Sequence, residues 1–187
     1  MNIANAATLI RLILGLVGAI LLALFGPSAA APALLLFGIS VALDGVDGYL
    51  ARSRNCETIL GRSFDAATDN SVLWVHLLAL VEFGQFSVWL IAAAVVRELF
   101  LQGFWDYAEM CGAKIHKIVF GHSRYLCQVG AVMAGESALW LGEDGKNDWA
   151  AGARLLSTLL IGTSLLIGYS TLLLTYYLNR DVLARGR

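Results

Sequence analysis

Long apolar runs recur along the chain, and they constrain its fold more than any other feature. Runs of about 20 residues are long enough to cross a hydrocarbon core roughly 30 Å thick. Only two prolines interrupt the 187 residues. Charged residues make up 14% of the chain, well below the roughly 25% of soluble domains. The sequence therefore predicts an all-α, polytopic integral membrane protein.

The pattern of runs and loops predicts six transmembrane helices in a single membrane domain over residues 1–187. "GPSAAAP" separates the first two, and "GEDGKND" is the clearest loop. The first run resembles a secretory signal peptide, but hydrophobicity resumes directly after it, so we expect it to be retained as a span. The six helices are expected near residues 6–26, 32–54, 58–82, 86–110, 116–141 and 151–180.

Basic residues are distributed unequally between the two sides of this arrangement, and such an excess marks the cytoplasmic side. One side receives only Lys146 and Arg154. The other receives Arg11, Arg52, Arg54, Arg62, Lys114, Lys117, Arg124, Arg180, Arg185 and Arg187. We therefore expect a bacterial inner-membrane protein with both termini in the cytoplasm. The net charge of −1 gives no indication of a nucleic-acid partner.

Four aspartates stand where the second and third predicted spans meet, at the cytoplasmic side. Asp44 and Asp47 are three residues apart, and Asp65 and Asp69 are four apart, so each pair shares a helical face. A tight connection would turn the two faces toward each other. Clustered carboxylates near hydrocarbon are costly unless they are paired or metal-bound, and hard oxygen ligands favour magnesium, manganese or calcium.

The residues around the aspartates suit a phosphate-containing substrate. Glycines and Ala51 allow a bulky group to approach the backbone closely, and Arg52 can hold a phosphate. Arg54 and Arg62 can hold the phosphate of an anionic acceptor. The alternative is that Arg52, Arg54 and Arg62 simply pair with the aspartates at a wet interface.

The same stretch resembles the signature of the CDP-alcohol phosphotransferase family at every defining position. It reads Asp44-x2-Asp47-Gly48-x2-Ala51-Arg52-x8-Gly61-x3-Asp65-x3-Asp69. The resemblance implies a six-span enzyme, often homodimeric, that transfers a substituted phosphate from a CDP-linked donor such as CDP-diacylglycerol to an alcohol and releases CMP. It also implies two magnesium ions, or manganese, held by Asp44, Asp47, Asp65 and Asp69, with Asp69 as general base.

Other positions of the resemblance concern the nucleotide. Gly48, Ala51, Arg52 and Gly61 resemble the family's CDP-binding positions. Asn5-x2-Thr8-x2-Arg11 resembles its amino-terminal pattern, with Ala4 where members often have proline, and adds Asn5 and Thr8 to the nucleotide site. The alternative for Asn5 and Thr8 is helix capping.

The identity of the acceptor alcohol depends on weaker features. Arg97-Glu98 is an ionisable pair inside the fourth predicted span, and such residues are expensive there; it can equally be a self-neutralising structural pair. Gly121-His122-Ser123-Arg124, followed by Gln128, is similar to a basic pattern of phosphatidylglycerophosphate synthases, although His122 and Arg124 replace lysines and Tyr125 a threonine.

The resemblance therefore implies a phosphorylated acceptor such as glycerol 3-phosphate, held by Arg97, His122 and Arg124. Inositol phosphate, serine or another alcohol remain alternatives. A divalent-cation transporter is a remote alternative, because a transport site belongs near the membrane midplane and these acids cluster at one boundary. His76, in an apolar run, is interpreted as a packing residue.

Overall fold

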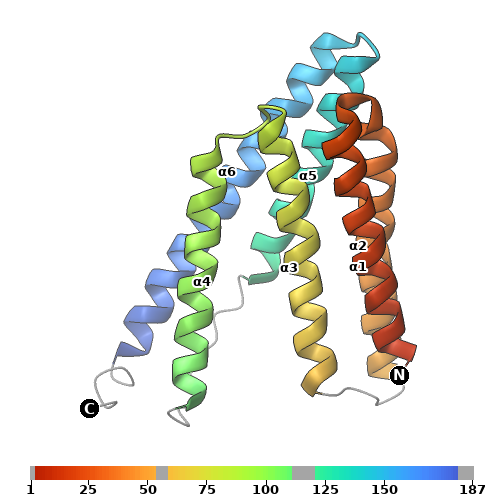
Figure 1. The fold of residues 1–187 in the computed structure, drawn as a ribbon. Coiled ribbons are helices and arrows are strands. Elements are labelled where there is room, and N and C mark those ends of the chain that lie inside the picture. The colour runs from red at the N-terminus through yellow and green to blue at the C-terminus, as the bar shows by residue number, and fades with distance from the viewer. Residues whose placement is uncertain (1–2, 54–58, 111–120, 181–187) are drawn as a thin grey trace. The chain divides into compact units, whose positions relative to one another are not determined.

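The structure is a computed structural model, and every regular element in its described residues is helical. It describes residues 3–53, 59–110 and 121–180, with the side chains of 3–5, 45–53, 59–63, 108–109 and 121 left aside. Within these ranges six α-helices follow one another in the predicted order (Figure 1). They are α1 (Ile3–Phe25), α2 (Ala30–Ser53), α3 (Ile59–Glu82), α4 (Val88–Met110), α5 (Gly121–Glu143) and α6 (Asn147–Leu178).

The helix boundaries differ from the predicted ones by a few residues. The predicted connector "GPSAAAP" is itself largely helical: a 3₁₀ turn, η1 (Gly26–Ala29), runs directly into α2. Pro32 does not delay α2, because a proline in the first turn removes only an N–H that has no helical acceptor. The predicted start of the fifth helix, at 116, falls outside the described residues.

Three helical stretches of the described chain are long and apolar enough to cross a membrane: Ala6–Asp44, Val88–Tyr107 and Asn147–Leu178. The first comprises α1 and most of α2. The helices α3 and α5 are not among them. The polar residues that lower their hydropathy include Asp65, Asp69, Arg124 and Glu136.

The chain divides into two compact units. The first contains residues 1–85 and 132–157, and the second contains residues 86–131 and 158–187. In the first unit α1 and α3 run parallel, since Arg11 contacts Asp69 and Gly15 contacts His76 further along both helices. Gly15 makes this close approach possible: a Cβ there would lie 2.4 Å from Val72 Cγ1.

The turns that end α3 and α5 both require glycine. Gly84 and Gly145 have φ angles of 67° and 73°, in the left-handed region that side chains with a Cβ rarely adopt. After Gly84, Gln85 N–H donates to Leu80 O at 2.9 Å, and after Gly145, Lys146 N–H donates to Leu141 O at 2.9 Å. Both are the backbone bonds of the Schellman motif, which terminates a helix cleanly.

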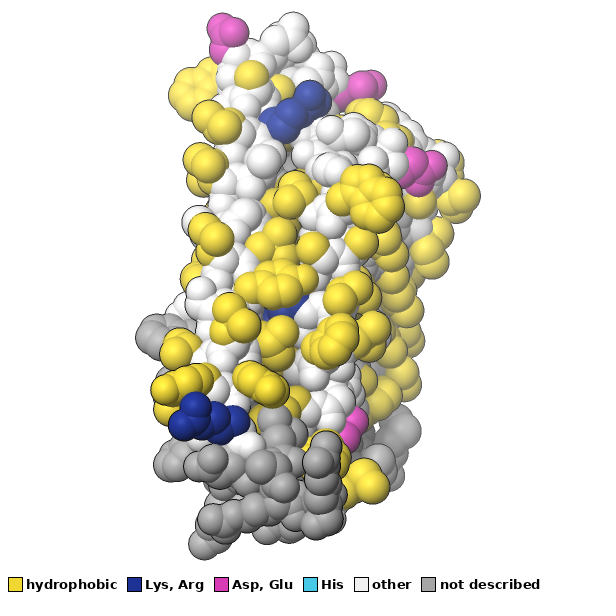
Figure 2. All heavy atoms as spheres, turned by 90° about the vertical axis from the view of Figure 1, so that its left-hand side faces the viewer, with side chains coloured by type: hydrophobic (Ala, Val, Ile, Leu, Met, Phe, Trp, Pro, Cys, Tyr) yellow, Lys and Arg dark blue, Asp and Glu magenta, His cyan; other side chains and the backbone are white. Residues whose placement is uncertain are grey.

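The second unit presents apolar side chains outward. Figure 2 faces the side on which α4 and α6 lie, and hydrophobic side chains predominate over these two helices. An apolar groove of about 670 Å³ lies along α4 and α6. Its lining is Leu99, Phe100, Gly103, Phe104, Leu172, Leu173 and Tyr176.

Candidate active site

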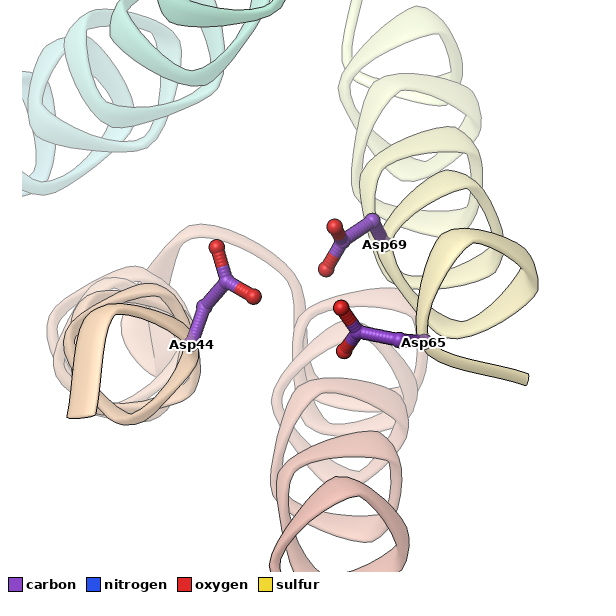
Figure 3. Close-up of side chains that lie close together, drawn as sticks. All are labelled: Asp44, Asp65 and Asp69. Atoms are coloured by element: carbon purple, nitrogen blue, oxygen red, sulfur yellow. The ribbon is translucent and has the colours of Figure 1, made fainter. Parts of the chain in front are cut away.

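Three of the four predicted aspartates come together in the first unit. Asp44 extends from α2, and Asp65 and Asp69 extend from neighbouring turns of α3, so that the three carboxylates point toward one another (Figure 3). One oxygen from each lies within 4.8 Å of the others. All three side chains are partly exposed, so the cluster is open to a ligand. The predicted convergence of the two helical faces is confirmed for these residues.

Arg11 of α1 contacts all three carboxylates, although sequence reasoning gave it no role there. Its Nη1 donates to Asp44 Oδ1, and its Nη2 lies 2.5 Å from Asp65 Oδ1 and 2.9 Å from Asp69 Oδ1. The Arg11 side chain is only 1% exposed. One signal in the sequence could have identified it: a lone arginine inside an apolar span is costly and therefore needs an anionic partner.

The backbone of α1 is fixed near this cluster by a side chain of α2. Ser40 Oγ donates to the Arg11 carbonyl at 3.1 Å. Thr8, three residues before Arg11, is buried and lies on the same face of α1. The burial of Thr8 is compatible with both of its predicted roles, nucleotide contact and helix capping.

Several predicted site residues cannot be placed by their side chains. Arg54 lies outside the described residues altogether. The others lie on helical backbone whose side chains are outside the description: Asn5 on α1, Asp47, Gly48, Ala51 and Arg52 on α2, and Gly61 and Arg62 on α3. Their roles stay predictions, as does the alternative that Arg52, Arg54 and Arg62 neutralise the aspartates.

The three carboxylates fit a divalent cation. Carboxylate oxygens are the ligands that magnesium, manganese and calcium prefer. Oxygens from α2 and α3 lie within 4.8 Å of one another, so a single ion between them is within reach of both helices. Because all three metals prefer carboxylate oxygens, the three aspartates do not distinguish magnesium from manganese or calcium.

The predicted acceptor residues form a separate cluster in the second unit. Arg97 is buried, and its Nε, Nη1 and Nη2 donate to Gly168 O, Glu98 Oε2 and Thr171 Oγ1 at 2.8–2.9 Å. Arg124 Nη1 lies 3.0 Å from the same Glu98 oxygen. Arg97 and Glu98 therefore do form the ion pair that was the structural alternative.

The side chains of Arg124 and His122 have fewer of their polar groups bound within the protein than Arg97 has. Arg124 also donates from Nη1 to Gln128 Oε1 at 3.0 Å, while its Nε is buried and has no hydrogen-bond partner among the described residues. Two guanidinium groups share one carboxylate here, so these three side chains carry a net positive charge. His122 is exposed at the start of α5.

A second ionisable pair, His76 and Glu136, was not predicted. Both side chains are fully buried, and His76 Nδ1 lies 2.5 Å from Glu136 Oε1. The Nε2 of His76 lies 2.9 Å from Gly15 O, so Nε2 carries the proton and donates it, because a carbonyl can only accept. His76 is buried as predicted, but it links α1, α3 and α5 by hydrogen bonds and is more than a packing residue.

Comparison with known proteins agrees with the geometry. A family model described as CDP-alcohol phosphatidyltransferase matches residues 1–175. Two curated relatives are each named CDP-diacylglycerol–glycerol-3-phosphate 3-phosphatidyltransferase. The Bacillus subtilis (strain 168) protein is 29% identical over 108 residues, which is 58% of this chain and 56% of the relative.

The second relative, from Mycoplasma pneumoniae, is 33% identical over 75 residues, covering 40% of this chain and 33% of the relative. The matched region thus spans about half the length of one relative and a third of the other. The family model, in contrast, covers nearly the whole chain. The chain belongs to the CDP-alcohol phosphatidyltransferase family.

Proposed function

We propose that this protein transfers a phosphatidyl group from CDP-diacylglycerol to sn-glycerol 3-phosphate and releases CMP. The observation that carries the proposal is the convergence of Asp44, Asp65 and Asp69 from α2 and α3, at positions where the sequence resembles the family's signature. Family membership supports the donor chemistry, and the names of the two relatives support the acceptor. Inositol phosphate or another alcohol is the alternative acceptor.

Asp44, Asp65 and Asp69, with Asp47, would hold magnesium or manganese, in two ions if the family pattern applies. When bound, such ions neutralise negative charge on the donor's pyrophosphate and on the departing CMP. Gly48, Ala51, Arg52 and Gly61, joined by Asn5 and Thr8, are proposed to bind the CDP moiety. The small residues leave room for the nucleotide beside the backbone.

The reaction needs a base for the acceptor hydroxyl, and we assign this role to Asp69. The acceptor oxygen forms a bond to the phosphatidyl phosphorus, the bond from that phosphorus to the CMP oxygen breaks, and CMP leaves with the electron pair. The acceptor proton goes to the Asp69 carboxylate. A positioned carboxylate of this kind typically contributes about 10²–10⁴-fold to a rate.

The basic cluster of the second unit is proposed to hold the phosphate of the acceptor. Arg97 uses its guanidinium within the protein, on Gly168, Glu98 and Thr171. Arg124, with an unsatisfied Nε, and the exposed His122 are better placed to meet an anion. Arg97 would then act by orienting Glu98, which in turn contacts Arg124. Arg54 and Arg62 are further candidates.

The membrane arrangement is part of the same proposal. We propose six spans with both termini and the carboxylate cluster on the cytoplasmic side of the bacterial inner membrane. Three stretches of sufficient length and hydropathy support membrane insertion. A diacylglycerol tail can then stay in lipid while the CDP headgroup and acceptor arrive from water. The apolar groove on α4 and α6 offers a surface for acyl chains.

A purified-protein assay tests the proposed reaction. Labelled CDP-diacylglycerol is offered with glycerol 3-phosphate, inositol phosphate, serine or no acceptor, with and without magnesium. We expect CMP release only with glycerol 3-phosphate and metal, and loss of that release in Asp65→Asn. Release with inositol phosphate instead would correct the acceptor alone, and no release with any alcohol would overturn the transferase proposal.

A further inference from the structure

We infer that Arg11 is a built-in cation that holds the carboxylate cluster together before metal arrives, and that a divalent ion must displace it to bind. This inference rests on the proposed function, because it takes the cluster of Asp44, Asp65 and Asp69 to be the metal site. It concerns Arg11, to which the signature of four aspartates assigns no role.

The geometry places the guanidinium of Arg11 at the point where the carboxylates meet. Arg11 Nη1 contacts Asp44 of α2, and Arg11 Nη2 contacts Asp65 and Asp69 of α3. The arginine comes from a third helix, and a planar fork of fixed donors is suited to bridging several carboxylates. One side chain thereby ties α1, α2 and α3 together at their common end.

The charges explain why such a cation is needed. The three carboxylates have oxygens within 4.8 Å of one another, and like charges that close together repel one another strongly when water does not fully screen them. Arg11 reduces this repulsion, and the carboxylates in turn compensate its almost complete burial. Loss of Arg11 leaves the cluster with a larger unbalanced negative charge, which destabilises the metal-free protein.

The same geometry makes Arg11 and a bound metal ion competitors. A magnesium ion binds carboxylate oxygens at about 2.1 Å, so an ion shared by these aspartates would occupy nearly the space that the two guanidinium nitrogens hold. Two cations that close together also repel. Metal binding therefore includes the cost of moving Arg11, and that cost disappears when the positive charge is removed.

The test compares Arg11→Gln, Arg11→Lys and the wild-type chain in detergent micelles, with Mn²⁺ as the probe. Free Mn²⁺ is counted by electron paramagnetic resonance during a titration, and thermal unfolding is followed by far-UV circular dichroism with and without Mn²⁺. Arg154→Gln is the matched control. It removes one positive charge from the same unit, where Arg154 Nε on α6 donates to Gln85 Oε1, in the turn after α3, at 3.3 Å.

We expect Arg11→Gln to bind Mn²⁺ about tenfold more tightly than wild type, within the range usual for two coupled ligands. We also expect it to melt at a lower temperature without metal and to gain more from Mn²⁺. Arg11→Lys keeps the charge and stays close to wild type in affinity. Arg154→Gln changes neither quantity.

Three results would overturn the inference, and the last of them would also overturn the proposed metal site. Mn²⁺ binding to folded Arg11→Gln that is equal to or weaker than wild type means that Arg11 supports the ion. If Arg11→Gln does not fold, Arg11→Lys still decides: a several-fold gain in affinity there contradicts a role that depends on charge. No saturable Mn²⁺ binding to wild type removes the proposed metal site itself and the inference with it.

Discussion

Asp69 occupies a position with two possible uses. It stands one turn beyond Asp65 on α3, and its Oδ1 lies 2.9 Å from Arg11 Nη2. As a carboxylate at the edge of the cluster it can ligate metal, and as the member of the cluster farthest along α3 it can meet the acceptor hydroxyl. The neutral isostere asparagine separates these uses, because it keeps an oxygen ligand but cannot accept the proton.

We predict that Asp69→Asn retains metal-dependent binding of the CDP donor and loses turnover by about 100-fold or more, the usual range for loss of a general base. Calorimetric titration with CDP in the presence of magnesium measures binding, and CMP release measures turnover. Asp148→Asn, an exposed acid at the start of α6, serves as control. If donor binding is lost together with turnover, Asp69 is primarily a metal ligand.

At the level of helices, α1 depends on its small residues. A Cβ at Gly15 would lie 2.4 and 2.7 Å from the two γ-methyl carbons of Val72 on α3. Valine has little rotational freedom in a helix, so it cannot turn away. Gly15 also accepts the hydrogen bond from His76, so a shift of α1 would strain that bond as well.

We therefore predict that Gly15→Ala lowers the free energy of unfolding by about 1–3 kcal/mol, the usual cost of overpacking. The double variant Gly15→Ala, Val72→Ala should be less destabilised than the sum of the two single changes. Gly38→Ala is the control, because a Cβ at Gly38 of α2 meets nothing within 4 Å. Denaturant unfolding in mixed micelles measures all four variants, and strict additivity would argue against the Gly15–Val72 contact.

At the level of the whole chain, the excess of basic residues on one side predicts where each loop lies. A cysteine at Asp144, in the α5–α6 turn, should react with an impermeant thiol reagent added to intact cells. A cysteine at Arg180, after α6, should react only once the cells are opened. Both are placed in a chain whose native cysteines are replaced. The reverse pattern would contradict the proposed orientation. Labelling of both cysteines in intact cells would mean that α6 does not cross the membrane.

The sequence predicted α1, α2, α4 and α6 well because each of them lies in a long apolar stretch, and it also predicted α3 and α5, in which polar residues interrupt the apolar ones. It also predicted the meeting of Asp44 with Asp65 and Asp69, because the acids stand at helical spacing on either side of a short connection that turns α3 back toward α2. The contacts of Arg11 with the aspartates and of Glu136 with His76 were not predicted. A helical repeat shows which residues share a face of one helix, but partners such as Arg11 with Asp69, or His76 with Glu136, are set by which helices become neighbours.

The contacts of Arg11 and of His76 differ in when they can form during synthesis. Arg11, Asp44, Asp65 and Asp69 all lie within the first three helices, so a ribosome completes this set of opposite charges before it translates α4. The contact between His76 and Glu136 forms later in synthesis, because Glu136 follows His76 by 60 residues. In the proposed six-span arrangement, the first three helices can thus enter the bilayer with part of their charge already paired, and α5 later supplies the buried carboxylate that contacts His76.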